Sequence, residues 1–226
     1  MINVLLVDDH TVVRAGYRHL LQAAADITII AEAENGEEAY HLHQKHKPNV
    51  TVMDISMPGI GGLEALRRIL AQDSHARVLI FTMHDDMVFA SRALEDGAKG
   101  YLSKTCSPEA LIEAVRTVAA GRKYLGQEVA QKIAMQSAQG AGDTLKNLTA
   151  REFEVFTSLA QGLALNEVGE RLNLDYKSVV NIQTRIRQKL NIPRDFHFSA
   201  GPFFYSRNII QKLFRKSKGF FRRPFW

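Results

Sequence analysis

The 226-residue sequence has little that would suit a secreted or membrane-bound protein. Its single cysteine, Cys106, cannot close a disulfide within the chain, and no spacing of cysteine and histidine resembles a zinc cluster. No stretch approaches the roughly 18 uncharged apolar residues that a membrane helix needs. The N-terminus, MINVLLVDDH, reaches two aspartates before the apolar core of a signal peptide could develop. The sequence therefore predicts a cytoplasmic protein with no membrane segment, and it excludes the disulfide-rich and zinc-finger classes.

Charge is distributed unevenly along the chain. Residues 1–121 contain 11 Lys and Arg against 16 Asp and Glu, whereas residues 122–226 contain 18 against 8. Basic residues favour contact with nucleic acid and acidic residues oppose it. A nucleic-acid role is therefore expected only in the second half.

The first half alternates short apolar segments with amphipathic ones. Five segments of strand length are rich in β-branched and apolar residues, namely 2–7, 27–33, 50–54, 77–82 and 99–103. Between them, apolar residues recur at helical spacing. Because right-handed crossovers place helices on both faces of a parallel sheet, this alternation predicts an α/β domain over residues 1–121, built on a doubly wound five-stranded parallel sheet.

Polar residues follow the predicted strands where ligands bind to such sheets, beyond the carboxyl ends. They are Asp8 and Asp9 after the first strand, Asp54 in the third, Thr82 in the fourth and Lys104 after the fifth. Three neighbouring carboxylates repel one another unless a cation neutralises them, and hard oxygen ligands suit Mg²⁺. The alternative is that each acid only caps the helix that follows. The first strand is followed by VDDHTVV and no glycine-rich loop, so a small anion is favoured over a nucleotide cofactor.

Four segments resemble, in order and spacing, the receiver domains of two-component response regulators, which have a flavodoxin-like fold. They are VLLVDDH, MDISMPGIGG, the FT that ends the fourth strand, and KGYLSK. The longer segment MDISMPGIGGLEALRRI is especially similar to GacA/UvrY-type regulators. The resemblance implies that Asp54 accepts a phosphoryl group from a sensor histidine kinase.

The same resemblance implies the roles of the surrounding residues. Asp9 would bind Mg²⁺ directly and Asp8 through water, while Asp54 and the Ser56 carbonyl would complete the metal shell. Thr82 and Tyr101 match the switch pair, and Lys104 matches the lysine that contacts the phosphoryl group. Thr82 is expected to move toward the phosphoryl group and leave room for Tyr101 to turn inward.

Other noticeable residues of the first half are expected to be structural. Pro58, Gly59, Gly61 and Gly62 indicate a constrained turn. The histidines make no metal pattern and are expected at the surface or in loops: His10, His41, His43, His46, His75 and His84.

The second half begins with a predicted linker over residues 122–145, which contains the small polar stretch SAQGAGDT and one short helix within 127–135. Thr149 and Glu152 have the spacing of a capping box and predict the start of a helix, which Gly162 ends. Apolar spacing predicts two further helices, over residues 166–172 and 176–190. Helical spacing alone fits a protein-docking bundle as well as a DNA-binding domain.

Residues 148–192 resemble the LuxR-type helix-turn-helix of the NarL/FixJ family. The resemblance implies a small all-α domain over residues 146–193, whose third helix lies in the major groove of double-stranded promoter DNA. Polar residues of that helix able to reach DNA are Lys177, Asn181, Gln183, Thr184, Arg185 and Lys189. Val180 and Ile182 stand where the family usually carries a lysine and a histidine, which lowers the expected affinity. A solvated helix face is the alternative for the remaining polar residues.

Residues 194–226 break with this pattern. They hold 10 of the 19 aromatic residues, and eight Lys and Arg against one acid. Three interpretations stay open: a foreign reading frame left by a frameshift, a basic and aromatic arm that binds anionic lipid or single-stranded nucleic acid, or a fourth helix through Ile209, Ile210, Leu213 and Phe214.

Taken together, these features predict a response regulator that is not an enzyme. A sensor histidine kinase would phosphorylate Asp54, and the helix-turn-helix would bind promoter DNA as a homodimer. The alternative is a phosphorylation-dependent protein-interaction receiver whose C-terminal half is degenerate and does not bind DNA. A phosphatase or phosphotransferase that uses two aspartates is disfavoured, because Asp54 is followed by ISMPG and not by a second acid.

Overall fold

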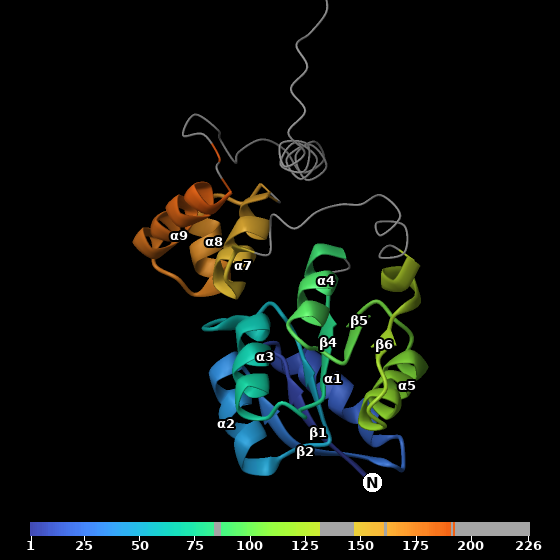
Figure 1. Cartoon of the computed structure of the whole chain (residues 1–226). Coiled ribbons are helices and arrows are strands. Elements are labelled where there is room, and N and C mark those ends of the chain that lie inside the picture. The colour runs from blue at the N-terminus through green and yellow to red at the C-terminus, as the bar shows by residue number, and fades with distance from the viewer. Residues whose placement is uncertain (84–86, 132–146, 161, 191, 193–226) are drawn as a thin grey trace, which may run out of the picture. The chain divides into compact units, whose positions relative to one another are not determined.

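The computed structural model describes residues 1–83, 87–131, 147–160, 162–190 and 192 (Figure 1). The chain divides into two compact units, residues 1–138 and 139–226.

The first unit is built on a parallel six-stranded sheet. Its strands are β1 (Ile2–Val7), β2 (Ile27–Ala33), β3 (Val50–Met53), β4 (Val78–Thr82), β5 (Gly100–Ser103) and β6 (Tyr124–Leu125). They are ordered β2-β1-β3-β4-β5-β6, and every neighbouring pair is parallel. The first five strands confirm the sequence prediction to within one residue at each end.

The prediction of five strands is nevertheless wrong, because β6 lies in the segment expected to be linker. This strand of two residues is held by backbone hydrogen bonds on either side of it: Tyr124 N–H donates to the Lys99 carbonyl (3.0 Å), and Gly126 N–H donates to the Tyr101 carbonyl (2.9 Å). Two residues are too few to show an alternating pattern, so the sequence carries no local signal for this strand.

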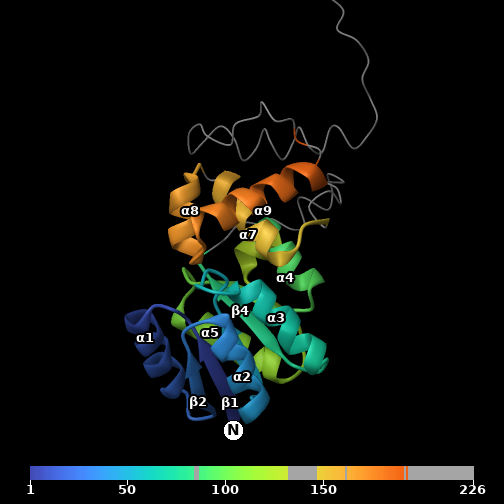
Figure 2. The same ribbon diagram turned by 90° about the vertical axis from the view of Figure 1, so that its left-hand side faces the viewer.

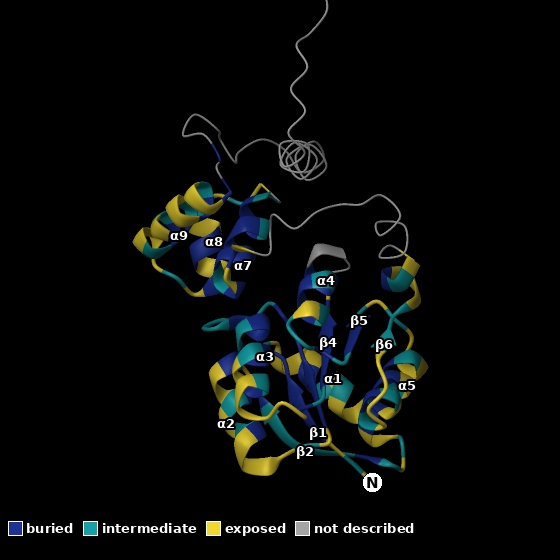
Figure 3. Ribbon diagram, in the orientation of Figure 1, coloured by how far each residue is buried: buried dark blue, intermediate teal, exposed yellow. Residues whose placement is uncertain are grey.

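Helices cover both faces of the sheet, as the α/β alternation predicted. They are α1 (Thr11–Gln22), α2 (Gly36–His46), α3 (Gly61–Gln72), α4 (Met87–Glu95) and α5 (Pro108–Ala119). Figures 1 and 2 show α1 and α5 on one side of the sheet and α2 and α3 on the other. Alternate strand residues, such as Val4 and Leu6, pack with Leu111 and Val115 of α5, which follows from the two-residue period of a strand. The doubly wound receiver-like fold is therefore confirmed, and Figure 3 shows its buried strands beneath helices with exposed outer faces.

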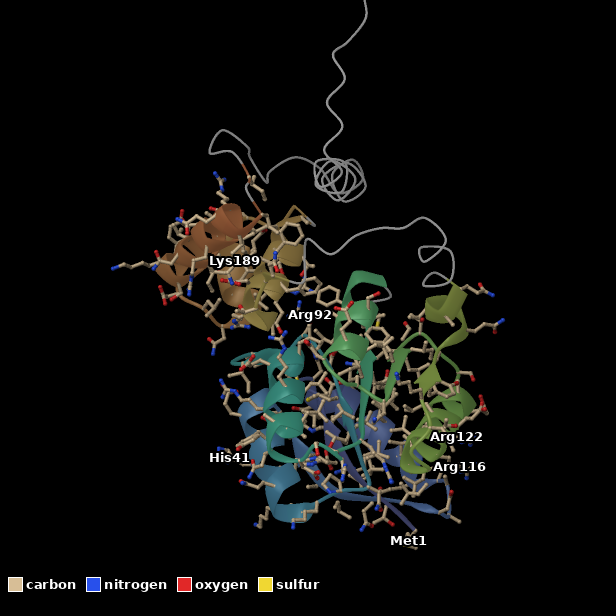
Figure 4. The ribbon with its side chains drawn as sticks, viewed as in Figure 1. Met1, His41, Arg92, Arg116, Arg122 and Lys189 are labelled. Carbon is tan, nitrogen blue, oxygen red and sulfur yellow. The ribbon has the colours of Figure 1, made fainter. Side chains whose placement is uncertain are left out.

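One histidine departs from the expectation of surface positions. His41 is exposed on the outer side of α2 (Figure 4), but His43 is buried on the inward side of the same helix. Its Nδ1 lies 2.9 Å from the Thr51 hydroxyl of β3. Burial lowers the pKa of His43, although Asp73 acts in the opposite direction. The surface prediction is wrong for His43, which is a core residue with a hydrogen-bonded ring; His84 lies outside the described residues.

The second unit contains three short helices, as predicted: α7 (Ala150–Ala160), α8 (Leu165–Leu172) and α9 (Tyr176–Lys189). The capping box is formed, because Thr149 N–H donates to Glu152 Oε2 (2.8 Å) and Glu152 N–H donates to Thr149 Oγ1 (3.2 Å). Gly162, with φ of +89°, follows α7 in the left-handed region that favours glycine. Apolar residues from all three helices form the core of this unit, among them Phe153, Val168 and Ile186.

Several predictions fall on residues outside the described part of the chain. Residues 127–131 are helical, whereas the rest of the expected short helix and of the linker is not described. The three interpretations of residues 194–226 also concern residues that are not described. Within the described helices, none is long and apolar enough to cross a membrane.

Candidate functional site

The carboxyl ends of β1, β3 and β5 bring three charged side chains together. Lys104 Nζ lies 2.6 Å from Asp8 Oδ2 and 2.6 Å from Asp54 Oδ2, and all three side chains are buried. Burial acts to lower the pKa of Lys104, but the attraction of Asp54 and Asp8 outweighs it, and the pKa is raised. The convergence predicted from the strand ends is therefore present in the structure.

Asp9 lies at the more exposed side of this group. Its Oδ1 is 2.9 Å from His10 Nδ1. The pKa of Asp9 is raised, first by burial, with Asp54 and Asp8 adding to the effect and His10 opposing it. Ligand atoms of Asp8, Asp9 and His10 lie within 4.8 Å of one another. The residues form an acidic pocket whose oxygen donors fit a hard divalent cation. His10 is exposed, as expected, but it lies beside these acids, which its surface assignment did not predict.

The turn after β3 positions the Asp54 carboxylate. Asp54 Oδ1 accepts hydrogen bonds from Ile55 N–H (2.6 Å) and, at the long limit, from Ser56 N–H (3.4 Å). Gly62, at the start of α3, approaches so closely that a Cβ there would collide with the Asp54 carbonyl oxygen. Gly59 and Gly61 have positive φ angles, of 79° and 67°. The glycines predicted to form a constrained turn therefore let α3 begin directly against the aspartate.

Thr82 and Tyr101 lie on the adjacent strands β4 and β5, and both are fully buried. The Thr82 carbonyl accepts a hydrogen bond from Lys104 N–H (2.8 Å), which places Thr82 at the edge of the acidic pocket. The Tyr101 side chain is fully buried in this structure.

Helix α9 presents one polar face and one apolar face. Lys177, Asn181, Thr184 and Arg185 are exposed and follow helical spacing, whereas Val179, Ile182 and Ile186 are buried. Gln183 is half-buried at the boundary between these faces. Four of the six predicted DNA-contacting residues therefore share one accessible face.

Lys189 differs from those four residues. Its ammonium lies 2.7 Å from Glu152 Oε2, so it forms an ion pair with the residue that caps α7 (Figure 4 labels Lys189). Burial acts to raise the pKa of Glu152, but Lys189 and the Thr149 N–H outweigh it, and the pKa is lowered. Lys189 thus holds the end of α9 to the start of α7.

Comparison with known proteins assigns both units. Residues 4–116 match the response regulator receiver domain, and residues 146–197 match the luxR family of bacterial regulatory proteins. The chain is also 37% identical over 197 residues to the response regulator UvrY of Escherichia coli K12, covering 86% of this chain and 90% of UvrY. The chain belongs to the NarL/FixJ family of two-component response regulators.

Other relatives of this response regulator agree with the assignment. The response regulator GacA of Pseudomonas aeruginosa is 34% identical over 86% of this chain and 92% of its own. Among solved structures, a LuxR-family two-component response regulator from Aurantimonas is 42% identical, with a TM-score of 0.60 over 61% of this chain and 99% of that one. The similarity to GacA/UvrY-type regulators predicted from the receiver segment is therefore confirmed, and the family is one of transcription regulators, not a class of enzymes. Residues 198–226 of this response regulator lie beyond both matched domains.

Proposed function

We propose that this response regulator accepts a phosphoryl group on Asp54 from the phosphohistidine of a sensor histidine kinase, and that phosphorylation controls the binding of promoter DNA by α9. The observation that carries the proposal is the position of Lys104 Nζ, 2.6 Å from both Asp8 and Asp54. The Lys104 ammonium and the carboxylates of Asp8 and Asp54 converge there at the edge of the acidic pocket. A transferred phosphoryl group would meet a nucleophile, Asp54, and a cation, Lys104, at that place.

In this reaction an Asp54 carboxylate oxygen attacks the phosphorus atom of the phosphohistidine. A P–O bond forms, the P–N bond breaks, and its electron pair leaves on the imidazole nitrogen, which is then protonated by solvent. The Ile55 N–H, which donates to Asp54 Oδ1, orients the carboxylate. Lys104 would bind a phosphoryl oxygen, and Thr82 at the rim would donate its hydroxyl to another. Positioning and charge stabilisation of this kind provide most of phosphoryl-transfer catalysis.

The acidic pocket supports Mg²⁺ as the cofactor. Asp9, Asp8 and Asp54, with the Ser56 carbonyl, are the residues that would hold it. The ion would supply the positive charge that offsets the charge of the transferring group. The donor set is consistent with this assignment, because Mg²⁺ takes oxygen ligands and keeps several waters.

For the second unit, the proposal is that the exposed face of α9 enters the major groove. Lys177 and Arg185 would contact phosphates, while Asn181 suits a base edge. Helix-turn-helix proteins bind paired half-sites as dimers, so the active form would be a homodimer. The proposed partners, a kinase phosphohistidine and promoter DNA, support a cytoplasmic location.

A second candidate function is a receiver that acts through protein partners and no longer binds DNA. Two observations favour it. Val180, at the flank of the exposed face, stands where the family usually carries a lysine, and Lys189 is paired with Glu152, so α9 offers fewer free cations than the family pattern suggests.

The experiment that tests phosphorylation labels the full chain with a small acyl phosphate donor and Mg²⁺. Asp54→Asn should abolish the acid-stable, base-labile label, whereas Asp73→Asn, which removes an exposed carboxylate of the same domain, should not. Label at the wild-type level in Asp54→Asn would overturn the phosphoacceptor assignment.

The DNA-binding half is tested by a salt series of gel shifts with promoter DNA. The full chain and a chain ending at Ile192 are each compared with and without phosphorylation. Sequence-selective binding that phosphorylation strengthens supports the transcription factor. Weak, sequence-blind binding that disappears with residues 193–226 supports the second candidate.

A further inference from the structure

A buried arginine lies beside the acidic pocket and is not explained by the proposed function. The Arg14 side chain on α1 is only 8% exposed. Its guanidinium donates three hydrogen bonds: from Nη1 to the Asp8 backbone carbonyl (2.5 Å), from Nε to Glu32 Oε2 (3.1 Å) and from Nη2 to Glu34 Oε1 (2.7 Å). Arginine is rarely buried without such partners. Each of the three nitrogens of this planar cation therefore has a defined acceptor.

The Asp8 carbonyl lies at the point where β1 becomes the turn that carries the acids. Asp8 N–H donates to the Ala33 carbonyl at the end of β2 (3.1 Å), and Asp8 Oδ1 accepts from His10 N–H (2.9 Å). The bond from Arg14 acts on the next peptide group, between Asp8 and Asp9. That peptide group joins the two residues whose carboxylates line the acidic pocket.

Glu32 and Glu34 fix the guanidinium itself. Glu32 lies near the carboxyl end of β2 and Glu34 directly follows that strand, so the two glutamates hold Arg14 against the same edge of the sheet. Arg18 also pairs with Glu32 (2.9 Å), but its side chain is 47% exposed. Arg14 thus connects the rigid end of β2 to the backbone of the Asp8–Asp9 turn.

We propose that Arg14 is a positioning residue for the metal-binding acids: by holding the Asp8 carbonyl, it keeps Asp8 and Asp9 in the orientation that binds a divalent cation. The inference rests on the proposed function, because it concerns the same acidic pocket. Residues that orient metal ligands without touching the metal typically change its affinity 10–100-fold when replaced.

The geometry distinguishes arginine from lysine at this position. A guanidinium presents five N–H donors in a fixed planar fork, whereas an ammonium is a compact point charge at the end of a flexible chain. Arg14→Lys keeps the positive charge but cannot hold the carbonyl and both glutamates together. A loss of metal affinity in Arg14→Lys therefore reports orientation and not charge.

The test measures Mn²⁺ binding to the full chain by electron paramagnetic resonance, since Mn²⁺ shares the preference of Mg²⁺ for carboxylate and water oxygens. Arg14→Lys should bind Mn²⁺ about tenfold more weakly than wild type. The matched control, Arg18→Met, removes the neighbouring arginine that pairs with Glu32 and should bind as wild type does. Glu34→Gln, which weakens one anchor at an exposed position, should show a smaller loss in the same direction.

A second readout separates positioning from a general loss of structure. The Mg²⁺ concentration that gives half-maximal labelling by a small phosphodonor should rise in Arg14→Lys by the same factor as the Mn²⁺ dissociation constant. The labelling rate at saturating Mg²⁺ should stay within about twofold of wild type, because bound metal restores the orientation.

The inference is overturned if folded Arg14→Lys binds Mn²⁺ as tightly as wild type. If Arg14→Lys does not fold, Glu34→Gln decides, and wild-type affinity in that variant overturns the inference. Failure of the proposed function looks different, because the wild-type chain itself would then bind no Mn²⁺ or take no label at Asp54.

Discussion

Replacing Lys104 by methionine should destabilise the first unit by about 3 kcal/mol at pH 7. The Lys104 side chain is 5% exposed, and its partners Asp8 and Asp54 are 2% and 6% exposed, so water cannot take the place of the lost ammonium. Removing one partner of a buried ion pair typically costs about 3–5 kcal/mol, because the remaining charge is left buried and unpaired. We expect the lower end of that range, since His10 N–H and Ile55 N–H still donate to the two carboxylates.

The assay is hydrogen exchange of the most protected amides of β3 and β4 in the full chain, which reports the first unit separately from the second. A loss of about 3 kcal/mol corresponds to exchange about 100-fold faster, at 1.4 kcal/mol for each factor of ten. Lys45→Met removes an exposed lysine of α2 and serves as the matched control, with exchange expected within about twofold of wild type. Exchange in Lys104→Met at the rate of Lys45→Met would refute the reasoning.

The dependence on pH gives a further check. The pKa of Lys104 is raised above its ordinary value of 10.5, so the ion pairs stabilise the protein fully below that pH. Their contribution is lost only as the pH rises through the raised value in the folded state. The difference between wild type and Lys104→Met should therefore be constant from pH 7 to 9 and shrink under strongly alkaline conditions.

Three further predictions follow from the packing of individual residues. Gly62→Ala should lower the rate of labelling at Asp54 about 100-fold, because the added Cβ collides with the Asp54 backbone and displaces the carboxylate. A labelling rate within about twofold of wild type would contradict this reasoning. Burial holds the pKa of His43 below 6.5, so wild type should lose stability as the pH falls from 7 to 5, where the unfolded chain takes up a proton at this histidine more readily. His43→Gln should make that loss smaller, as measured by urea unfolding. His41→Gln, on the exposed side of α2, should keep the wild-type pH profile. Lys189→Met should speed hydrogen exchange in α7 by about fivefold, equivalent to about 1 kcal/mol, because it leaves the buried Glu152 carboxylate without its cation. Lys177→Met, which removes an exposed lysine of α9, should leave that exchange unchanged.

The sequence predicts the receiver fold closely where structure depends on local patterns. Segments such as 2–7 and 27–33 are rich in apolar and β-branched residues, and the strands β1 and β2 begin and end at those residues. The strand β6 could not be predicted in this way, because it exists only through hydrogen bonds to Lys99 and Tyr101. His43 was misplaced for a related reason: the other histidines of α2, His41 and His46, are exposed, and only the packing of that helix against β3 decides which side is buried.

The acidic pocket was predictable because parallel strands bring their carboxyl ends to one edge. That rule alone places Asp8, Asp54 and Lys104 together, although Lys104 lies 96 residues from Asp8 and 50 residues from Asp54 in the sequence. Arg14 was missed because its role depends on Glu32 and Glu34, which lie 18 and 20 residues away on another strand. Nothing in the spacing of a helix that looks amphipathic indicates that one of its cations is turned inward.

Val180 and Ile182, the two residues of α9 that differ from the family pattern, have different consequences for DNA binding because they lie on different sides of the folded helix. Ile182 is 6% exposed and belongs to the core of the three helices, so the absence of the family's histidine there removes nothing from the outward face. Val180 is half-buried at the flank of the exposed residues, and it is the position at which the outward side lacks a cation. Lys189 is positively charged, but it forms an ion pair with Glu152. The case against DNA binding therefore depends on one missing cation and one paired cation, while Lys177 and Arg185 still present their charges on the face that would meet the phosphates.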